Sequence, residues 1–130
     1  MFRWGFLKVK RKMPSVRQVR GYWSTRLDLA ELGFDSAFEF TTEAGSCFAC
    51  GQDSGSPERA HIKPRNQGGG DDVGNIHILC RICHKDSELL EGEEYMAWLY
   101  ERSVIDVAFS LAAKRGLNIH SLIHKHLKRE

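Results

Sequence analysis

The sequence predicts an α+β fold, in which a small core of two strands and one helix is flanked by further helices and by a basic N-terminal arm. Four cysteines mark the core, because they fall in two Cys-x2-Cys pairs, Cys47/Cys50 and Cys80/Cys83. Two short strand patterns lie between the pairs, and helical periodicity begins at the second pair. With 130 residues, 42% of them hydrophobic, the chain is long enough for one modest hydrophobic core.

The chain divides into three predicted segments. Residues 45–90 carry the cysteines and form the core module. Residues 1–44 are a basic arm followed by short helices, and residues 91–130 are a C-terminal helical extension.

The expected elements follow in chain order. Pro14 and Gly21 interrupt residues 1–25, which are predicted to be irregular or briefly helical. Asp35 is a plausible N-cap and Gly45 a helix stop, while Ser103 and Asn118 are plausible N-caps further along, with Gly116 as a stop. The predicted helices span 26–32, 35–44, 82–90, 93–101, 104–115 and a segment after 118, and the predicted strands span 59–62 and 76–80, joined by the loop 66–75.

Several apolar residues are expected to be buried. Tyr95, Trp98 and Leu99 are spaced to share one face of a helix. His77 alternates with two isoleucines of a predicted strand and so faces away from them, where a structural or peripheral role is favoured over contact with substrate. We also assign Val104, Ile105, Val107, Phe109 and Leu111 to the core.

Charge is distributed unevenly, although the net charge is only +2. Residues 1–27 hold eight Lys or Arg and no acid, residues 28–113 hold six bases against sixteen acids, and residues 114–130 hold five bases against one acid. Basic ends around an acidic centre are typical of arms that grip a polyanion, and such binding weakens as salt rises. A solubilising tail is the alternative.

The cysteine pairs predict a metal site. No apolar run approaches the ~20 residues that span a bilayer, and charges interrupt the hydrophobic residues of the N-terminus, so neither a membrane protein nor a secreted one is expected. In a cytosolic chain, two Cys-x2-Cys pairs indicate a four-thiolate zinc site rather than disulfides. The expected zinc ligands are Cys47, Cys50, Cys80 and Cys83.

The segment from Cys47 to His84 resembles the HNH endonuclease family, in its branch with a four-cysteine zinc site around a ββα-metal core. After the first cysteine pair come Ala60-His61-Ile62-Lys63-Pro64, then Gly68-Gly69, then Asn75-Ile76-His77-Ile78-Leu79-Cys80 and Cys83-His84. The resemblance implies a metal-dependent endonuclease that nicks or cuts DNA, with Mg²⁺ or another divalent cation beside the structural zinc. Members of this family are frequent in bacteria and phages, which implies a cytoplasmic location in such a host.

Three residues would carry the chemistry that this resemblance implies. His61 would be the general base that accepts the proton of the attacking water, since an imidazole titrates near neutrality. Asn75 would orient His61 by accepting its other ring N–H. His84, directly after the last cysteine, would bind the divalent cation.

The chain departs from the family at Ala60. Many relatives carry Asp or His there as a second metal ligand, and alanine has no ligand atom. Glu88 lies four residues after His84, on the same helical face, and is therefore a candidate second ligand. An exposed carboxylate without a role is the alternative for Glu88.

Basic residues around the proposed centre are candidates for contacts to nucleic acid, namely Lys63, Arg65, Arg81 and Lys85. One centre cleaves one strand at a time, so a double-strand break would need a homodimer or two visits. Two other functions remain open. A non-catalytic zinc module that binds nucleic acid or a protein would explain Ala60, and an RNA substrate would use the same chemistry.

Overall fold

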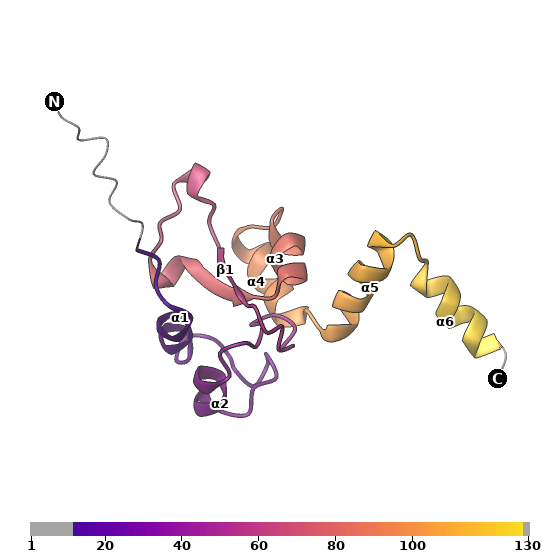
Figure 1. The fold of residues 1–130 in the computed structure, drawn as a ribbon, viewed down its shortest axis with the longest axis horizontal. Helices are drawn as coiled ribbons and strands as arrows, with labels where there is room; N and C mark the ends of the chain where they lie inside the picture. Colours follow the sequence, from indigo (N-terminus) through magenta and orange to yellow (C-terminus); the bar gives the residue numbers. More distant parts are fainter. Residues whose placement is uncertain (1–11, 129–130) are drawn as a thin grey trace.

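A strand pair followed by a helix forms the centre of the fold in the computed structural model, which describes residues 12–128 (Figure 1). Strand β1 (Glu58–His61) pairs antiparallel with β2 (Ile76–Leu79), and α3 (Arg81–Ser87) follows directly. The register places His61 opposite Ile76 and Ala60 opposite His77. The predicted α+β class and the ββα order are therefore confirmed.

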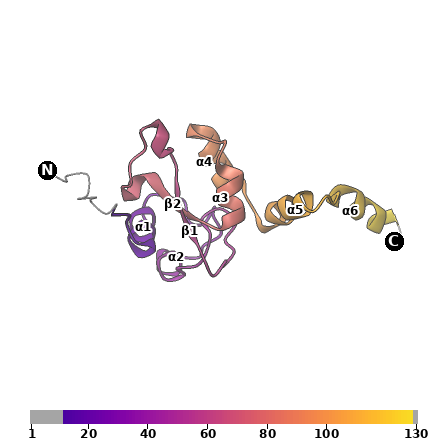
Figure 2. The same ribbon diagram turned by 45° about the horizontal axis from the view of Figure 1, so that its top comes forward.

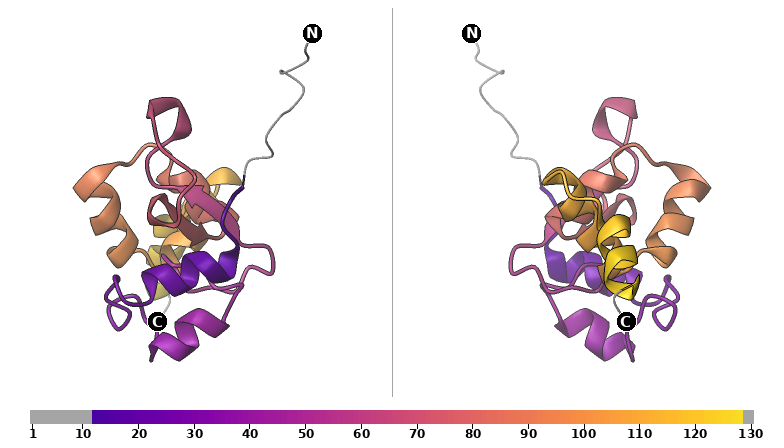
Figure 3. Two further views of the ribbon diagram at one scale, coloured as in Figure 1. Left: turned by 90° about the vertical axis from the view of Figure 1, so that its left-hand side faces the viewer. Right: turned by 90° about the vertical axis from the view of Figure 1, so that its right-hand side faces the viewer.

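The loop between the strands contains two short 3-10 turns, η2 (Arg65–Gln67) and η3 (Val73–Asn75). It projects at the end of the molecule away from α2 (Figure 3). Both strands match the predicted positions within one residue at each end. The predicted helix 82–90 extends too far, since α3 ends at Ser87 with Glu88 as its C-cap.

The N-terminal segment is more ordered than its composition predicts. Helix α1 (Val16–Trp23) begins with a capping box, in which the Ser15 hydroxyl accepts from the N–H of Gln18 and the Gln18 side chain accepts from the N–H of Ser15. Such reciprocal bonds satisfy two N–H groups that a helix start leaves unpaired. Gly21 lies inside this helix rather than ending it.

The predicted helix over 26–32 is wrong, because this segment consists of turns. They end at Gly33, whose φ of 93° a helix does not allow. Helix α2 (Ala37–Thr42) lies within the predicted range 35–44, but its N-cap is Ser36 rather than Asp35. The Ser36 hydroxyl accepts from the N–H of Glu39 at 3.1 Å.

Three helices follow the strand pair, namely α4 (Gly92–Glu101), α5 (Val104–Lys114) and α6 (Ile119–Lys128). Ser103 and Asn118 cap α5 and α6 as predicted, and Gly116 follows α5 with a φ of 75°. Helices α5 and α6 extend away from the centre (Figures 1 and 2). Among the described residues, no helix is long and apolar enough to cross a membrane.

Part of the core predicted on α5 is wrong, because this helix extends away from the centre of the fold (Figure 1). Tyr95, Leu99 and Val107 are buried as expected. Val104, Ile105 and Leu111 are 49%, 64% and 38% exposed, because α5 turns only one side toward α3. Helical spacing predicts which residues share a face, but it does not predict whether a partner covers that face.

The hydrophobic core combines residues from before, within and after the predicted module. Val19 of α1 and Phe40 of α2 pack with Phe48, Ile78 and Leu99 in one cluster of buried side chains. Helices α1 and α4 lie on different sides of the strand pair (Figure 2). The strand pair is therefore covered on both faces, and all four residues of β2 are buried.

Candidate active site and metal centre

The four cysteines lie close together where two Cys-x2-Cys segments meet. We call these segments the knuckles: the first carries Cys47 and Cys50, and the second carries Cys80 and Cys83. The four Sγ atoms all lie within 4.8 Å of one another, and all four residues are buried. The Sγ atoms of Cys50 and Cys80 are 3.9 Å apart. Tetrahedral zinc with Zn–S bonds of 2.3 Å requires S–S separations of about 3.8 Å, whereas a disulfide requires about 2.05 Å. The predicted set of four cysteines thus fits a zinc ion and not a pair of disulfides.

Backbone hydrogen bonds hold the first knuckle against the returning strand. The N–H of Phe48 donates to the carbonyl of Ile78 at 2.8 Å, and Gly51 closes the turn through its N–H to Cys47 with a φ of 76°. In the second knuckle, Cys80 is the N-cap of α3, and its sulfur accepts from the N–H of Cys83 at 3.4 Å. Hydrogen bonding among the four sulfurs lowers the pKa of Cys80 and raises that of Cys83, so the cysteines act as one coupled cluster.

The guanidinium of Arg102 lies beside this cysteine cluster. Arg102 donates to Asp86 of α3 at 2.5 Å, and Ser110 of α5 donates to the same carboxylate oxygen at 2.6 Å. Burial alone would lower the pKa of Arg102, but interactions with the Cys83 sulfur and the Asp86 carboxylate raise it. The guanidinium therefore balances negative charge at the metal site and joins α3, α4 and α5.

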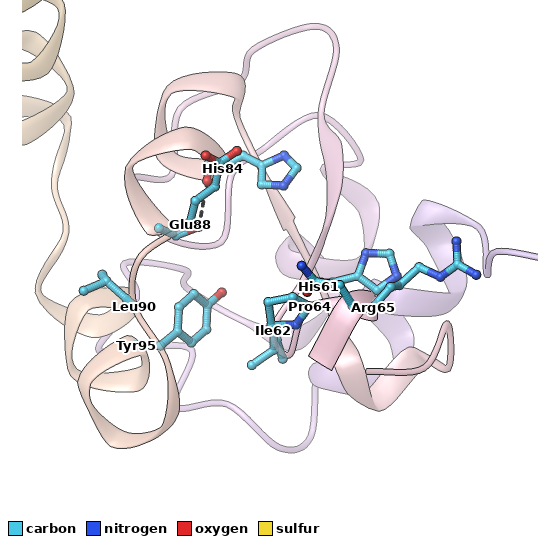
Figure 4. Close-up of a pocket in the computed structure, with 10 residues that line it drawn as sticks. His61, Ile62, Pro64, Arg65, His84, Glu88, Leu90 and Tyr95 are labelled. Carbon is cyan, nitrogen blue, oxygen red and sulfur yellow. Dashed lines mark hydrogen bonds between the residues drawn. The ribbon is translucent and has the colours of Figure 1, made fainter. Parts of the chain in front are cut away.

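His61 and His84 line one cleft of about 450 Å³, together with Glu88 (Figure 4). His61 is the last residue of β1, and His84 lies in α3. Their side chains are 19% and 33% exposed, so both imidazoles are accessible to solvent. Each also contacts a carboxylate that restrains it. Arg65 and Tyr95 complete opposite parts of the same lining. The structure thus brings together the two histidines that the sequence analysis selected.

Glu58 holds the imidazole of His84. Its Oε1 lies 2.7 Å from His84 Nδ1. Metal-binding histidines commonly donate one ring N–H to a carboxylate, which fixes the ring and leaves the other nitrogen for the ion. In this arrangement Nε2 of His84 is the ring atom that a cation would use.

Asp71 holds the imidazole of His61. Its Oδ1 lies 2.8 Å from His61 Nε2, and the Nε atom of Arg65 lies 3.8 Å from the same oxygen. Asp71 belongs to the loop between the strands, ten residues after His61. His61 is therefore held by a carboxylate.

The expected contact between Asn75 and the ring of His61 is not what the structure contains. The side-chain oxygen of Asn75 accepts from the N–H of Lys63 at 2.8 Å, and its amide donates to the carbonyls of Lys63 and Gly70 at 3.0 and 2.8 Å. Asn75 thus clamps the two arms of the loop together. Its amide is used by backbone groups, which are the usual partners of side-chain hydrogen bonds.

The Gly68-Gly69 pair serves this clamp. A Cβ at Gly69 would lie 1.8 Å from the carbonyl oxygen of Lys63 and 2.9 Å from Asn75 Nδ2. Gly68 has a φ of 89°, which favours glycine. The glycines allow a close approach of backbone, in agreement with the predicted loop.

The remaining candidates occupy different positions. Glu88 is exposed, is the C-cap of α3 and borders the cleft. Arg65 also borders it, whereas Lys63 is exposed on the loop and contributes its backbone to the Asn75 clamp. Arg81 and Lys85 are exposed on α3. His77 is fully buried, which agrees with the structural role that the sequence analysis favoured.

Sequence reasoning missed Glu58 and Asp71. Alternation along a strand could have identified Glu58, because residues 58 and 60 share a face and residue 60 is the alanine in place of a ligand. Ala60 is only 2% exposed, so this face is turned into the protein. No comparable periodicity identifies Asp71, since a loop residue is placed by the path of its loop.

Comparison with known proteins supports the family resemblance. Residues 47–88 match the family model described as HNH endonuclease. No curated protein and no solved structure matches the chain. The match begins at the first cysteine, ends at Glu88 and includes both histidines of the cleft. Together with the ββα order and the clustered cysteines, this match shows that residues 47–88 of the chain are similar to the HNH endonuclease family.

Proposed function

We propose that this protein is a metal-dependent endonuclease that hydrolyses phosphodiester bonds of DNA. The observation that carries the proposal is the single cleft shared by His61 of the strand pair and His84 of α3, within a segment that matches the HNH family. Each imidazole has a carboxylate partner, at 2.8 and 2.7 Å. A module that only binds nucleic acid has no need for two oriented imidazoles in one cleft.

His61 acts as the general base in this proposal. It accepts the proton of a water molecule as that water attacks the phosphorus of the scissile bond. Proton transfer to a positioned side chain contributes typically 10²–10⁴-fold to a rate. The 19% exposure of its side chain is compatible with contact to substrate and with a fixed ring.

His84 would hold a divalent cation through Nε2, with Glu88 as the second protein ligand. Mg²⁺ accepts few protein ligands and completes its shell with water and phosphate oxygens, so this pair fits that ion despite Ala60. A bound cation would supply Lewis-acid stabilisation of the charge that develops on the phosphate. Glu58 orients the His84 ring toward this task.

Exchanging the two glutamates separately tests these assignments. Glu88→Gln should weaken the apparent affinity for Mg²⁺ or Mn²⁺ in cleavage assays, because it removes a charged ligand. Glu58→Gln should weaken it about 10- to 100-fold, the usual effect of losing a partner that orients a ligand. Both variants should keep zinc and DNA affinity. A Glu88→Gln protein with unchanged cation dependence would remove Glu88 from the site.

Basic residues near the cleft are proposed to contact the DNA backbone. Arg65 borders the cleft, Lys63 is exposed on the loop between the strands, and Arg81 and Lys85 are exposed on α3. Contacts of this kind to phosphate release counterions, so binding should weaken steeply with salt. Cleavage of both strands would require a homodimer or two successive encounters.

Incubation of supercoiled plasmid with the protein tests the activity. We expect nicked circles with Mg²⁺ or Mn²⁺ and intact plasmid when EDTA is present in excess over the catalytic cation. A parallel panel of single-stranded DNA and RNA identifies the substrate class. Binding without cleavage under every cation would instead support a non-catalytic zinc module.

A further inference from the structure

The contact between His61 and Asp71 is not part of the chemistry that the sequence predicted. Nε2 of the ring lies 2.8 Å from Oδ1 of Asp71, a hydrogen-bond distance. Both side chains are about one-fifth exposed, so the pair is largely shielded from water. A carboxylate accepts hydrogen bonds and donates none, so the proton of this bond belongs to the ring nitrogen.

We propose that Asp71 is a positioning residue for His61. It holds the neutral imidazole in the tautomer with a proton on Nε2, which leaves the lone pair of Nδ1 to accept a proton. The inference rests on the proposed function for its catalytic consequence, although the tautomer itself is a property of the protein without substrate.

In this scheme Asp71 neither gains nor loses a proton. When water attacks, its oxygen bonds to phosphorus and the bond from phosphorus to the leaving sugar oxygen breaks. That oxygen takes a proton from solvent. The proton of the attacking water moves to Nδ1, and the ring becomes an imidazolium with protons on both nitrogens. The Nε2 proton stays in the bond to Asp71, which remains a carboxylate and stabilises the new positive charge. Such a carboxylate orients and stabilises the imidazole without itself becoming protonated.

The other charged groups around His61 do not duplicate this role. The Nε atom of Arg65 lies 3.8 Å from Asp71 Oδ1, at ion-pair distance from the carboxylate rather than from the ring. His84 and Glu88 line the same cleft from α3 and its C-cap. Nδ1 of His84 lies 2.7 Å from Oε1 of Glu58, so the carboxylate partner of His84 is a residue other than Asp71.

The Asn75 clamp places Asp71. The amide of Asn75 donates to the carbonyl of Gly70, the residue directly before Asp71. The same amide donates to the carbonyl of Lys63, two residues after His61. One side chain therefore links the backbone near His61 to the backbone next to Asp71. Asn75 therefore acts on His61 through the loop and Asp71 rather than by touching the ring.

Nitrogen-15 NMR of the histidine rings tests the tautomer directly in the zinc-loaded full-length protein above pH 8. The His61 signals are assigned by their loss in His61→Gln. We expect a proton on Nε2 in the wild-type protein and a loss of this preference in Asp71→Asn. The neighbouring acid gives a matched control, because Asp72→Asn makes the same charge change without removing the contact.

Cleavage kinetics test the consequence. Asp71→Asn should lower the single-turnover rate about 10- to 100-fold, with DNA affinity and zinc content within twofold of wild type. Asp72→Asn should stay within twofold of the wild-type rate. In a His61→Ala background, Asp71→Asn should cause no further loss, because the group that it positions is absent.

Two results would overturn the inference. One is a wild-type ring protonated on Nδ1, or an Asp71→Asn ring with an unchanged tautomer. The other is an equal loss of rate from Asp71→Asn with and without His61, which would assign Asp71 to folding or DNA binding. Failure of the proposed function is distinguishable, since the wild-type protein would then cleave nothing while the NMR result stood.

Discussion

His77 is a neutral imidazole enclosed by aromatic rings. Its ring centroid lies 4.5 Å from that of Trp23, 5.4 Å from that of Phe48 and 5.5 Å from that of Tyr95. The hydroxyl of Tyr95 and Nδ1 of His77 form a hydrogen bond at 2.6 Å, and Nε2 is buried without a partner among the described residues. Burial lowers the pKa of His77 to about 3. This histidine is therefore a core residue, and burial disfavours its charged form in the folded state.

The buried His77 predicts that acid weakens the fold. Its pKa rises from about 3 in the folded state to about 6.5 in the unfolded state, so between these values the unfolded chain binds the extra proton and stability falls as pH falls. Between pH 7.5 and pH 5.5 this costs about 1.4 kcal/mol of unfolding free energy. Urea titrations of zinc-loaded protein at both pH values measure it.

His77→Gln is the control for this prediction, because glutamine has similar polarity and does not titrate. The variant is expected to be less stable at pH 7.5 but to lose about 1.4 kcal/mol less on acidification. An identical pH dependence in both proteins would assign the acid sensitivity to other groups, such as the cysteines.

Single residues differ in how far the sequence predicts them. The cysteines, His61 and His84 could be selected because their type and spacing limit them to few roles. The partner of Asn75 could not, because an amide accepts and donates, and only the path of the loop decides which backbone groups it meets. Asp71 could not be predicted for the same reason. Glu58 could have been identified from the alternation of side chains along a strand.

Helix α3 and the two knuckles depend on one another. Cys80 and Cys83 belong to the start of α3, which also carries His84. Cys47 and Cys50 are fastened to β2 through the bond from Phe48 to Ile78. A metal at the four sulfurs therefore sets the position of the helix relative to the strand pair, and with it the position of His84 relative to His61.

Removing one sulfur tests this dependence. Cys80→Ser should lose the zinc and unfold the module, because the 10–16 kcal/mol typical of structural zinc sites matches or exceeds the 5–15 kcal/mol stability of a domain. Zinc content by metal analysis and circular dichroism measure the two effects. His61→Ala should keep both zinc and fold. A Cys80→Ser protein that retained its zinc and its melting temperature would contradict the assigned site.

Helix α1 shows why a charge count does not describe an element. The eight basic residues of 1–27 suggested an arm that grips a polyanion, but Arg20 is fully buried. It donates to the carbonyls of Phe40 and Ser46 at 2.5 and 2.7 Å and lies over the ring of Phe40. Four others, Arg3, Lys8, Lys10 and Arg11, lie outside the described residues.

The burial of Arg20 connects α1 to the metal site. Desolvation lowers the pKa of Arg20 to about 10, against the attraction of Glu43 and Cys47, so the side chain stays charged at neutral pH. Ser46, which it binds, directly precedes Cys47. Helix α1 therefore supports the first knuckle, a role that periodicity and composition did not indicate.

The whole molecule combines a recognisable module with a core that the flanks complete. Residues 47–88 match a known family, but their buried side chains pack against Val19, Phe40, Tyr95 and Leu99 from outside this range. The division into three segments remains a prediction. The hydrophobic cluster contains residues from all three. Family motifs predicted the clustered cysteines and the two histidines of the cleft, because residues of these types at this spacing have few roles. Packing of the flanks depends on shape, which no short motif encodes.

The central claim is that His61 is the base of a metal-dependent cleavage reaction. The most direct measurement is the single-turnover cleavage rate of duplex DNA by wild-type protein and by His61→Ala, with Mg²⁺ or Mn²⁺ and with matched zinc content and DNA occupancy. The account predicts a rate at least about 100-fold lower for His61→Ala, since a general base contributes 10²–10⁴-fold. Cleavage by His61→Ala at the wild-type rate would contradict it.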